Sequence, residues 1–200
     1  MKAGAQISLY AMTDRFVEVI MDAVGVIRGR SDLETRTDDL STVILGEERA
    51  VFATARDAFA AAAAGGVHVV LNAHFSRGCP GDDYCLTRWQ GEKASREGEP
   101  VPEGTLNELE PPGGAAAVQT AACQFALYPL GVADYMEQIY GAINHAKESG
   151  RFTASKNFVS RLDGTVSELF DELFAAFLAA GSDHTTIHAT ISANSPSNQQ

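Results

Sequence analysis

The chain has little cysteine, little positive charge and no long apolar run, and each shortage excludes a class of protein. Its three cysteines cannot all pair, which argues against a disulfide-rich secreted protein and favours a reduced, cytoplasmic one. The first residues lack the apolar core of a secretion signal, and no run approaches the roughly 20 apolar residues of a membrane span. With 15 Lys and Arg against 26 Asp and Glu, the formal charge is −11, so the sequence offers no basic surface for nucleic acid.

A short segment occurs twice, and the pattern around it repeats. Residues 6–10 (QISLY) recur as residues 124–128 (QFALY). Each copy is followed by an apolar segment with helical spacing, a predicted β-hairpin, a second helical segment and a final alternating strand. The order β-α-β-β-α-β, with both helices requiring the same sheet face, predicts an α+β protein. We expect a tandem duplication of ferredoxin-like βαββαβ subdomains, each with its helices on one face of an antiparallel sheet.

The repeat also gives the expected domain limits. We predict one ferredoxin-like subdomain over residues 3–78 and a second over residues 122–196, joined by a connection at 79–121. The connection is acidic, rich in Pro and Gly, and holds five of the seven prolines, so no regular pattern continues through it. Because a domain of about 75 residues buries only a modest share of its surface, we expect the halves to pack on each other or on a second copy in a homodimer.

Polar residues recur at matched positions of the two copies, on the sheet face that the helices should leave uncovered. The matched pairs are Tyr10 and Tyr128, Thr42 and Ser160, His68 and His184, and Ser76 and Ser192. Burying such groups without partners costs roughly 1–3 kcal/mol each. Two interpretations stay open, a polar interface between the halves or a bound polar ligand, and the mixture of aromatic and hydroxyl groups favours the ligand.

Motifs for metal binding or catalysis are weak. His68, Asn72 and His74 share a strand face close to Cys79 and Cys85, but no standard zinc spacing occurs, so we expect no metal ion and no cofactor. Cys79, in the segment Gly-Cys-Pro-Gly, is the best candidate nucleophile, although a lone cysteine more often packs than reacts. We expect a protein that is not an enzyme, with a Cys79-dependent activity as the minor alternative.

Five blocks of the sequence resemble one family. They are residues 8–14 (SLYAMTD), 37–43 (TDDLSTV), 75–82 (FSRGCPGD), 123–129 (CQFALYP) and 192–197 (SANSPS). In these blocks the chain resembles the YkoF family of thiamine/hydroxymethylpyrimidine-binding proteins. The resemblance implies two ferredoxin-like subdomains, a homodimer, a thiamine or hydroxymethylpyrimidine site in each subdomain, and a link to components of an ABC-type membrane transporter. One departure is Ala11, where family members tend to have the proline that the second copy keeps as Pro129.

The predicted ligand contacts come from both copies. An aminopyrimidine presents hydrogen-bonding groups on one edge and an apolar ring face, which hydroxyl groups, strand-edge backbone and tyrosines can meet. Carboxylates near the hairpins, Asp38, Asp39 and Asp163, suit the cationic thiazolium ring of thiamine. The predicted ligand-binding residues are Ser8, Leu9, Tyr10, Asp38, Thr42, Asn72, Ser76, Leu127, Tyr128, Ser160, Ser192 and Asn194.

The two predicted sites are not identical. At three positions Ser8, Asn72 and His74 are replaced by Ala126, His188 and Thr190 in the second copy. One lost hydrogen bond is worth about 0.5–1.5 kcal/mol, so we expect two ligands per chain with affinities that differ by roughly 2- to 13-fold. An amino-acid-sensing regulatory module of the ferredoxin-like kind stays open as an alternative.

Overall fold

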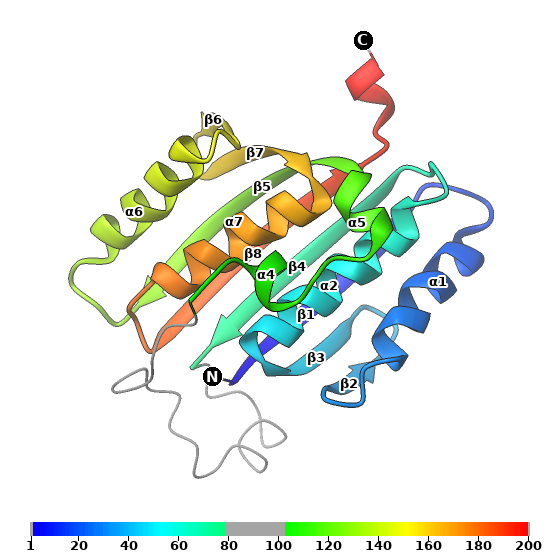
Figure 1. The fold of residues 1–200 in the computed structure, drawn as a ribbon, viewed down its shortest axis with the longest axis horizontal. Coiled ribbons are helices and arrows are strands. Elements are labelled where there is room, and N and C mark those ends of the chain that lie inside the picture. Colours follow the sequence, from blue (N-terminus) through cyan, green and yellow to red (C-terminus); the bar gives the residue numbers. More distant parts are fainter. Residues whose placement is uncertain (1, 79–102, 200) are drawn as a thin grey trace.

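The computed structural model describes residues 2–78 and 103–199, which form one antiparallel sheet with helices on a single face (Figure 1). Within these two ranges no helix is both long and apolar enough to cross a membrane. The elements of the first part are β1 (Lys2–Ala11), α1 (Phe16–Arg28), β2 (Glu34–Thr37), β3 (Thr42–Glu47), α2 (Glu48–Ala63) and β4 (Val69–Arg77). Those of the second are α4 (Leu106–Leu109), α5 (Gly114–Val118), β5 (Thr120–Leu130), α6 (Tyr135–Glu148), β6 (Phe152–Lys156), β7 (Val159–Thr165), α7 (Val166–Ala179), β8 (His184–Ala193) and η1 (Pro196–Gln199).

The strand order confirms the predicted fold class. The sheet runs β2-β3-β1-β4-β8-β5-β7-β6, so each half has the ferredoxin-like arrangement, with its first strand between its third and fourth. The last strands of the two halves, β4 and β8, pair along their length, from Val69 opposite Ala193 to Arg77 opposite Thr185. The two halves therefore share one eight-stranded sheet.

An internal two-fold relation passes through the β4–β8 junction. Ala73 pairs with Ala189, and these two residues occupy the same position in the two copies of the repeat. On either side, Asn72 pairs with Thr190, the counterpart of His74, and His74 pairs with His188, the counterpart of Asn72. A pairing in which each residue meets its counterpart is the pattern of an isologous dimer interface, formed here within one chain. The two halves consequently present their equivalent features at opposite ends of the sheet, with α1 at one side and α6 at the other (Figure 1).

Large apolar side chains of α2 and α7 join the halves into one core. The ring of Phe52 stacks on Phe75 with centroids 4.0 Å apart, and it also meets Phe174 at 5.3 Å and Phe177 at 5.1 Å. All four side chains are buried. Each aromatic pair of this kind stabilises the fold by about 0.5–1.5 kcal/mol beyond the contribution of its buried area. This cluster therefore fixes the middle of the sheet more firmly than its two ends.

Part of the predicted irregular connection is ordered. Residues 103–119, here called the strap, contain α4 and α5, and Leu106 and Ala116 bury their side chains against the core. The reason that periodicity misses them is their shortness, because four or five residues cannot display a helical repeat. A capping box in which Thr105 and Glu108 satisfy each other's backbone N–H starts α4.

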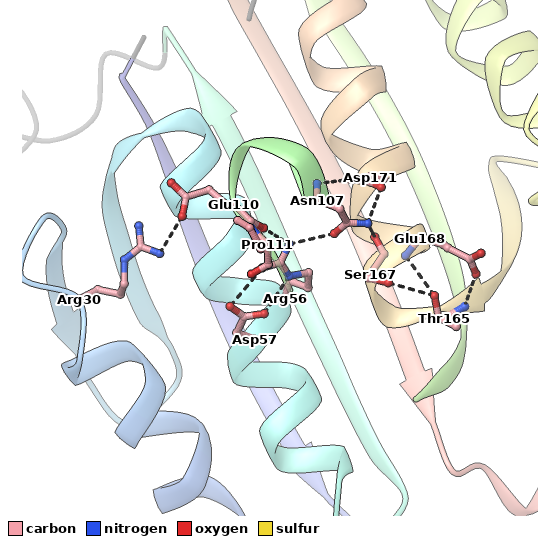
Figure 2. A network of polar contacts seen from close by, with 10 residues as sticks. All are labelled: Arg30, Arg56, Asp57, Asn107, Glu110, Pro111, Thr165, Ser167, Glu168 and Asp171. Carbon is pink, nitrogen blue, oxygen red and sulfur yellow. Dashed lines mark hydrogen bonds and ion pairs between the residues drawn. The ribbon is translucent and has the colours of Figure 1, made fainter. Parts of the chain in front are cut away.

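A polar network ties the strap to the central helices of both halves (Figure 2). The guanidinium of Arg56, fully buried on α2, donates to Asn107 Oδ1 at 3.0 Å and to the carbonyl oxygen of Glu110 at 2.8 Å. The backbone N–H of Asn107 in turn donates to Asp171 Oδ1 on α7 at 2.8 Å. Burial raises the pKa of Asp171, and the N–H of Asn107 opposes that rise. The strap thus bridges the two helices above the β4–β8 junction.

Candidate functional site

Two cavities lie at equivalent positions of the two halves, between the first strand, the first helix and the hairpin. The first cavity, of about 180 Å³, is lined by β1, α1 and the β2–β3 hairpin, together with residues of α2 and β4. The second cavity, of about 670 Å³, is enclosed by β5, α6 and the β6–β7 hairpin. Ligand cavities are usually about 300–1,000 Å³, so the second lies within the usual range and the first below it.

Unequal strand lengths create both cavities. β1 pairs with β4 as far as Ala11, but β3 pairs with β1 only as far as Ile7, so β1 beyond Ile7 has no strand on that side in the described structure. β5 repeats this arrangement, since it pairs with β8 to Leu130 and with β7 only to Phe125. Along such an edge alternate backbone N–H and C=O groups point outward, so each cavity has a wall of hydrogen-bonding backbone.

The hairpin tip of the first cavity is tied to the strand. Ser8 Oγ donates to the carbonyl oxygen of Leu40 at 2.9 Å, and Gln6 Nε2 donates to Ser41 Oγ at 2.9 Å. Asp38 Oδ1 accepts the backbone N–H groups of Leu40 and Ser41, each at 2.9 Å. These N–H groups, that of Leu40 first, hold the pKa of Asp38 below its usual range. The tip is therefore held against β1, where it lines the cavity, and it carries a negative charge.

The second cavity lacks this tie and is lined by aromatic residues. Ala126 occupies the position of Ser8, so no hydroxyl reaches the tip. Phe158, the counterpart of Leu40, is 91% exposed at the tip. Tyr128, Tyr135 and Tyr140 line the cavity and are about half-exposed. The result is a wider cavity whose walls can stack on a flat ring.

Seven of the predicted site residues line one of the two cavities. Ser8, Leu9, Asp38 and Thr42 line the first, and Leu127, Tyr128 and Ser160 line the second. Tyr10, the counterpart of Tyr128, lies half-exposed on β1 and is not among the residues that line the first cavity. Asp163 does not line the second cavity, since it lies opposite Ala122 in the paired part of β5, and its carboxylate pairs with Arg161 at 2.7 Å.

The other predicted residues lie away from both cavities. Asn72, Ser76 and Ser192 point from β4 and β8 to the sheet face without helices, and none of them lines the cavities at the unpaired edges of β1 and β5. They bond across the junction of the halves, in the pairs His68 Nε2–Ser192 Oγ at 3.1 Å, Asn72 Nδ2–His188 Nε2 at 3.2 Å and Ser76 Oγ–Thr186 Oγ1 at 3.2 Å. This arrangement corresponds to the polar interface that the sequence left open.

Asn194 has a structural position of its own. Its backbone has a φ of 56°, in the left-handed region that asparagine tolerates better than most residues. Its side-chain amide donates to the carbonyl oxygens of Ala63 and Val67, each at 2.9 Å, and its Oδ1 accepts from Gln119. Asn194 therefore links the end of β8 to the first half, and it is not among the residues that line either cavity.

The sequence analysis missed the helix residues that face the cavities. Val24 of α1 lines the first, and Met136, Tyr140 and Ile143 of α6 line the second. The apolar spacing that includes Val24, Met136 and Ile143 indicates a helix face that packs on the sheet, and it does not show where the opposing strand ends. Lys156 was also missed, although an alignment of the two hairpins makes it the counterpart of Asp38.

Cys79, the candidate nucleophile, and Cys85, weighed as part of a metal site, both lie outside the residues that the structure describes. Cys123 is buried on β5, and burial raises the pKa of its thiol. Among residues 2–78 and 103–199, no group of three or more His, Cys, Asp or Glu side chains is placed to hold a metal ion.

Comparison with known proteins adds a family and a relative. A family model described as "YKOF-related Family" matches residues 2–82 and 120–198. The chain is 38% identical over 198 residues to a protein of Bacillus subtilis (strain 168) named "Putative HMP/thiamine-binding protein YkoF", where HMP is hydroxymethylpyrimidine. The alignment covers 98% of this chain and 92% of that protein. The two matched parts coincide with the two halves of the sheet, so each half carries the family's pattern.

Proposed function

The chain belongs to the YKOF-related family, and from that premise we propose that it binds thiamine or its hydroxymethylpyrimidine precursor in the two cavities. The observation that carries this proposal is the repeated unpaired strand edge, at β1 beyond Ile7 and at β5 beyond Phe125, each facing an open cavity. A flat heteroaromatic ring with donors and acceptors on one edge can bond to such a strand edge as another strand would.

The side chains around each edge suit the rest of the ligand. Ser8 and Thr42 in the first cavity, and Ser160 in the second, bring hydroxyl groups to the lining. Tyrosines of the second cavity offer ring faces for stacking. Asp38 and Asp39 bring negative charge to the first, which favours the cationic thiazolium of thiamine.

The assembly and setting that we propose follow from the family. The chain acts as a cytoplasmic homodimer that serves uptake of the pyrimidine precursor by an ABC-type transporter. The sheet face opposite the helices supports the homodimer, since no element of the described chain covers it and it has internal two-fold symmetry. Light scattering of the purified chain at micromolar concentration tests this part, and a monomer would contradict it.

Binding without catalysis is the proposed activity. Calorimetry against thiamine, hydroxymethylpyrimidine and a panel of amino acids separates the candidates, with the expected result of two molecules of the pyrimidine-type ligand per chain. Binding of an amino acid instead would replace the proposal by a regulatory module. Turnover of thiamine that disappears in Cys79→Ser would replace it by an enzyme.

A further inference from the structure

The two hairpin tips correspond residue by residue. Thr37 pairs with Thr42 at the base of the first tip, and Ser155 pairs with Ser160 at the base of the second. Thr42 lies opposite Ile7 on β1, and Ser160 lies opposite Phe125 at the matching position on β5. Because both tips have the same length between matched anchors, positions 38–41 and 156–159 align without a gap.

This alignment reverses the charge at the mouth of the cavity. Asp38 corresponds to Lys156, and Asp39 corresponds to the neutral Asn157. Among the described residues that line the first cavity, Asp38 and Asp39 are the charged ones, giving −2. In the lining of the second, Lys156 is the charged residue, giving +1. Two sites built on the same backbone therefore have opposite electrostatic preferences.

The surroundings leave the Lys156 charge available to a ligand. Lys156 is exposed, and within the described chain its ammonium makes no ion pair. Asp163, on the facing strand, is engaged mainly by two nitrogens of Arg161, at 2.9 and 2.7 Å, and the charge of Lys156 adds a weaker attraction; both lower the pKa of the Asp163 carboxyl. Asp134 and Glu137, at the start of α6, do not line the cavity.

We propose that the second cavity binds an anionic ligand, a phosphate monoester of the same heteroaromatic alcohol whose unphosphorylated form the first cavity takes. The proposal rests on the proposed function, because it names the ligand class of one of its two sites. Thiamine and hydroxymethylpyrimidine each carry a primary alcohol, and phosphorylation there adds up to two negative charges. The cavity of about 670 Å³ has room for a ring beside its tyrosines and for a phosphate at the tip.

The other residues at the tip agree with this assignment. Asn157 and Ser155 line the second cavity and can donate to phosphate oxygens, whereas the matching Asp39 of the first tip would repel them. A cation beside a phosphate at a partly solvated site favours the phosphate form about fivefold, and more at low salt. The preference should therefore fall as salt is added.

The test compares thiamine with thiamine monophosphate by calorimetry on the full chain. Val24→Phe fills the small first cavity from α1, so that the remaining binding reports the second. Lys156→Asp is then added to reverse the charge at the tip. Lys147→Asp is the matched control, because it changes the net charge of the same half equally while its ammonium lies over the Phe152 ring, outside the cavity.

A second readout makes the test independent of the Val24→Phe variant. The second cavity is lined by Tyr128, Tyr135 and Tyr140, and the first by no tyrosine among its described lining residues. In a chain labelled with fluorotyrosine, ¹⁹F NMR signals of these three residues therefore follow the second cavity alone, with both cavities intact.

The expected result is about fivefold tighter binding of thiamine monophosphate in the second cavity, reversed by Lys156→Asp and kept by Lys147→Asp. Equal affinity for the two ligands, or a ratio that Lys156→Asp leaves unchanged while thiamine still binds, overturns this inference and leaves the proposed function standing. Absence of binding by either ligand to the unmodified chain overturns both.

Discussion

The two cavities share a frame and differ in their walls. In both, the first strand of the half extends beyond the end of its pairing with the hairpin, so its last backbone groups have no strand partner on that side in the described structure. In the first, Ser8 bonds to an acidic hairpin tip, and the cavity has a volume of about 180 Å³. In the second, Ala126 cannot form this bond, the tip carries Lys156 and the exposed Phe158, and the cavity volume is about 670 Å³. A duplicated fold can thus keep the backbone that binds a ring while single side chains set the size and charge of each site.

Both cavities depend on the rigid centre of the sheet, where the strap joins α2 and α7. Arg56→Ala, which breaks this network, has the largest expected effect on stability. Arg56 corresponds to Phe174 in the other half, so only one central helix holds the strap this way. Removing a buried guanidinium and leaving its acceptors unpaired should lower the free energy of unfolding by about 2–4 kcal/mol. Urea unfolding measures it. Arg49→Ala, a half-exposed partner of Glu110 at 3.6 Å, should cost less than about 0.5 kcal/mol, and an equal loss in both variants would contradict the role of the strap.

Exchanging the tie between strand and tip should make the cavities more alike. Ser8→Ala removes the bond to Leu40, costs about 0.5–1.5 kcal/mol of stability and lets the first cavity accept thiamine more readily relative to the smaller hydroxymethylpyrimidine. Ala126→Ser should act in the opposite direction on the second. Calorimetry with both ligands measures the change, with the exposed Ser31→Ala as control. If the ligand ratio at the first site stays constant in Ser8→Ala, the tie does not set its size.

Hydroxyl groups at the base of the tips should distinguish the sites one at a time. Thr42→Val removes a hydroxyl that bonds Thr37 Oγ1 at 3.0 Å and should weaken only the first site, while Ser160→Ala should weaken only the second. The expected loss is roughly 2- to 13-fold in each case, the value of one hydrogen bond. Titrations of the parent chain should fit two unequal sites. A fit to two identical sites, or unchanged affinities in Thr42→Val, would mean that these hydroxyls serve folding.

Lowering the pH should weaken thiamine binding more at the first cavity than at the second, and we expect this to be the smallest of the four effects. The backbone N–H groups of Leu40 and Ser41 lower the pKa of Asp38 in the folded chain, so its contribution is present above the unfolded pKa and is lost as pH falls through the folded pKa. Thiamine affinity at the first cavity should decline across that acidic range, together with the order of the tip. NMR of the Leu40 amide and calorimetry at several pH values measure both. Asp38→Asn should remove the dependence, and its persistence in that variant would assign it to another group.

Periodicity was enough to predict the repeated strand and helix order, because apolar spacing of two or of three to four residues shows which side chains share a face. The place of the cavities, at the unpaired edges of β1 and β5, was not predictable in this way. It depends on where β3 stops along β1, and Ile7 opposite Thr42 is a property of register that no single strand displays. The polar rows at Asn72, Ser76 and Ser192 looked like a site because an interface between two halves of one chain has the same alternating pattern.

Charge differences were readable but needed the correct alignment. Asp38 and Asp39 were recognised as an acidic tip, and Asp163 was grouped with them by its closeness to the other hairpin. The paired tips show that Lys156 is the true counterpart of Asp38, while Asp163 lies on the next strand beside Arg161. The strap escaped prediction because its two helices are too short to show a helical repeat, and its position depends on tertiary hydrogen bonds to Arg56 and Asp171.

The self-matching junction of β4 and β8 bears on the history of the chain. Ala73 facing its counterpart Ala189 is the contact that two separate copies of a half-length protein would make across a symmetry axis, which fits an origin by gene duplication and fusion of such a dimer. Expressed alone, either half would leave its final strand as an open edge of nine or ten residues, a template for aggregation. Fusion keeps that edge permanently covered, and it frees the two halves to diverge because they no longer need to be encoded by the same sequence.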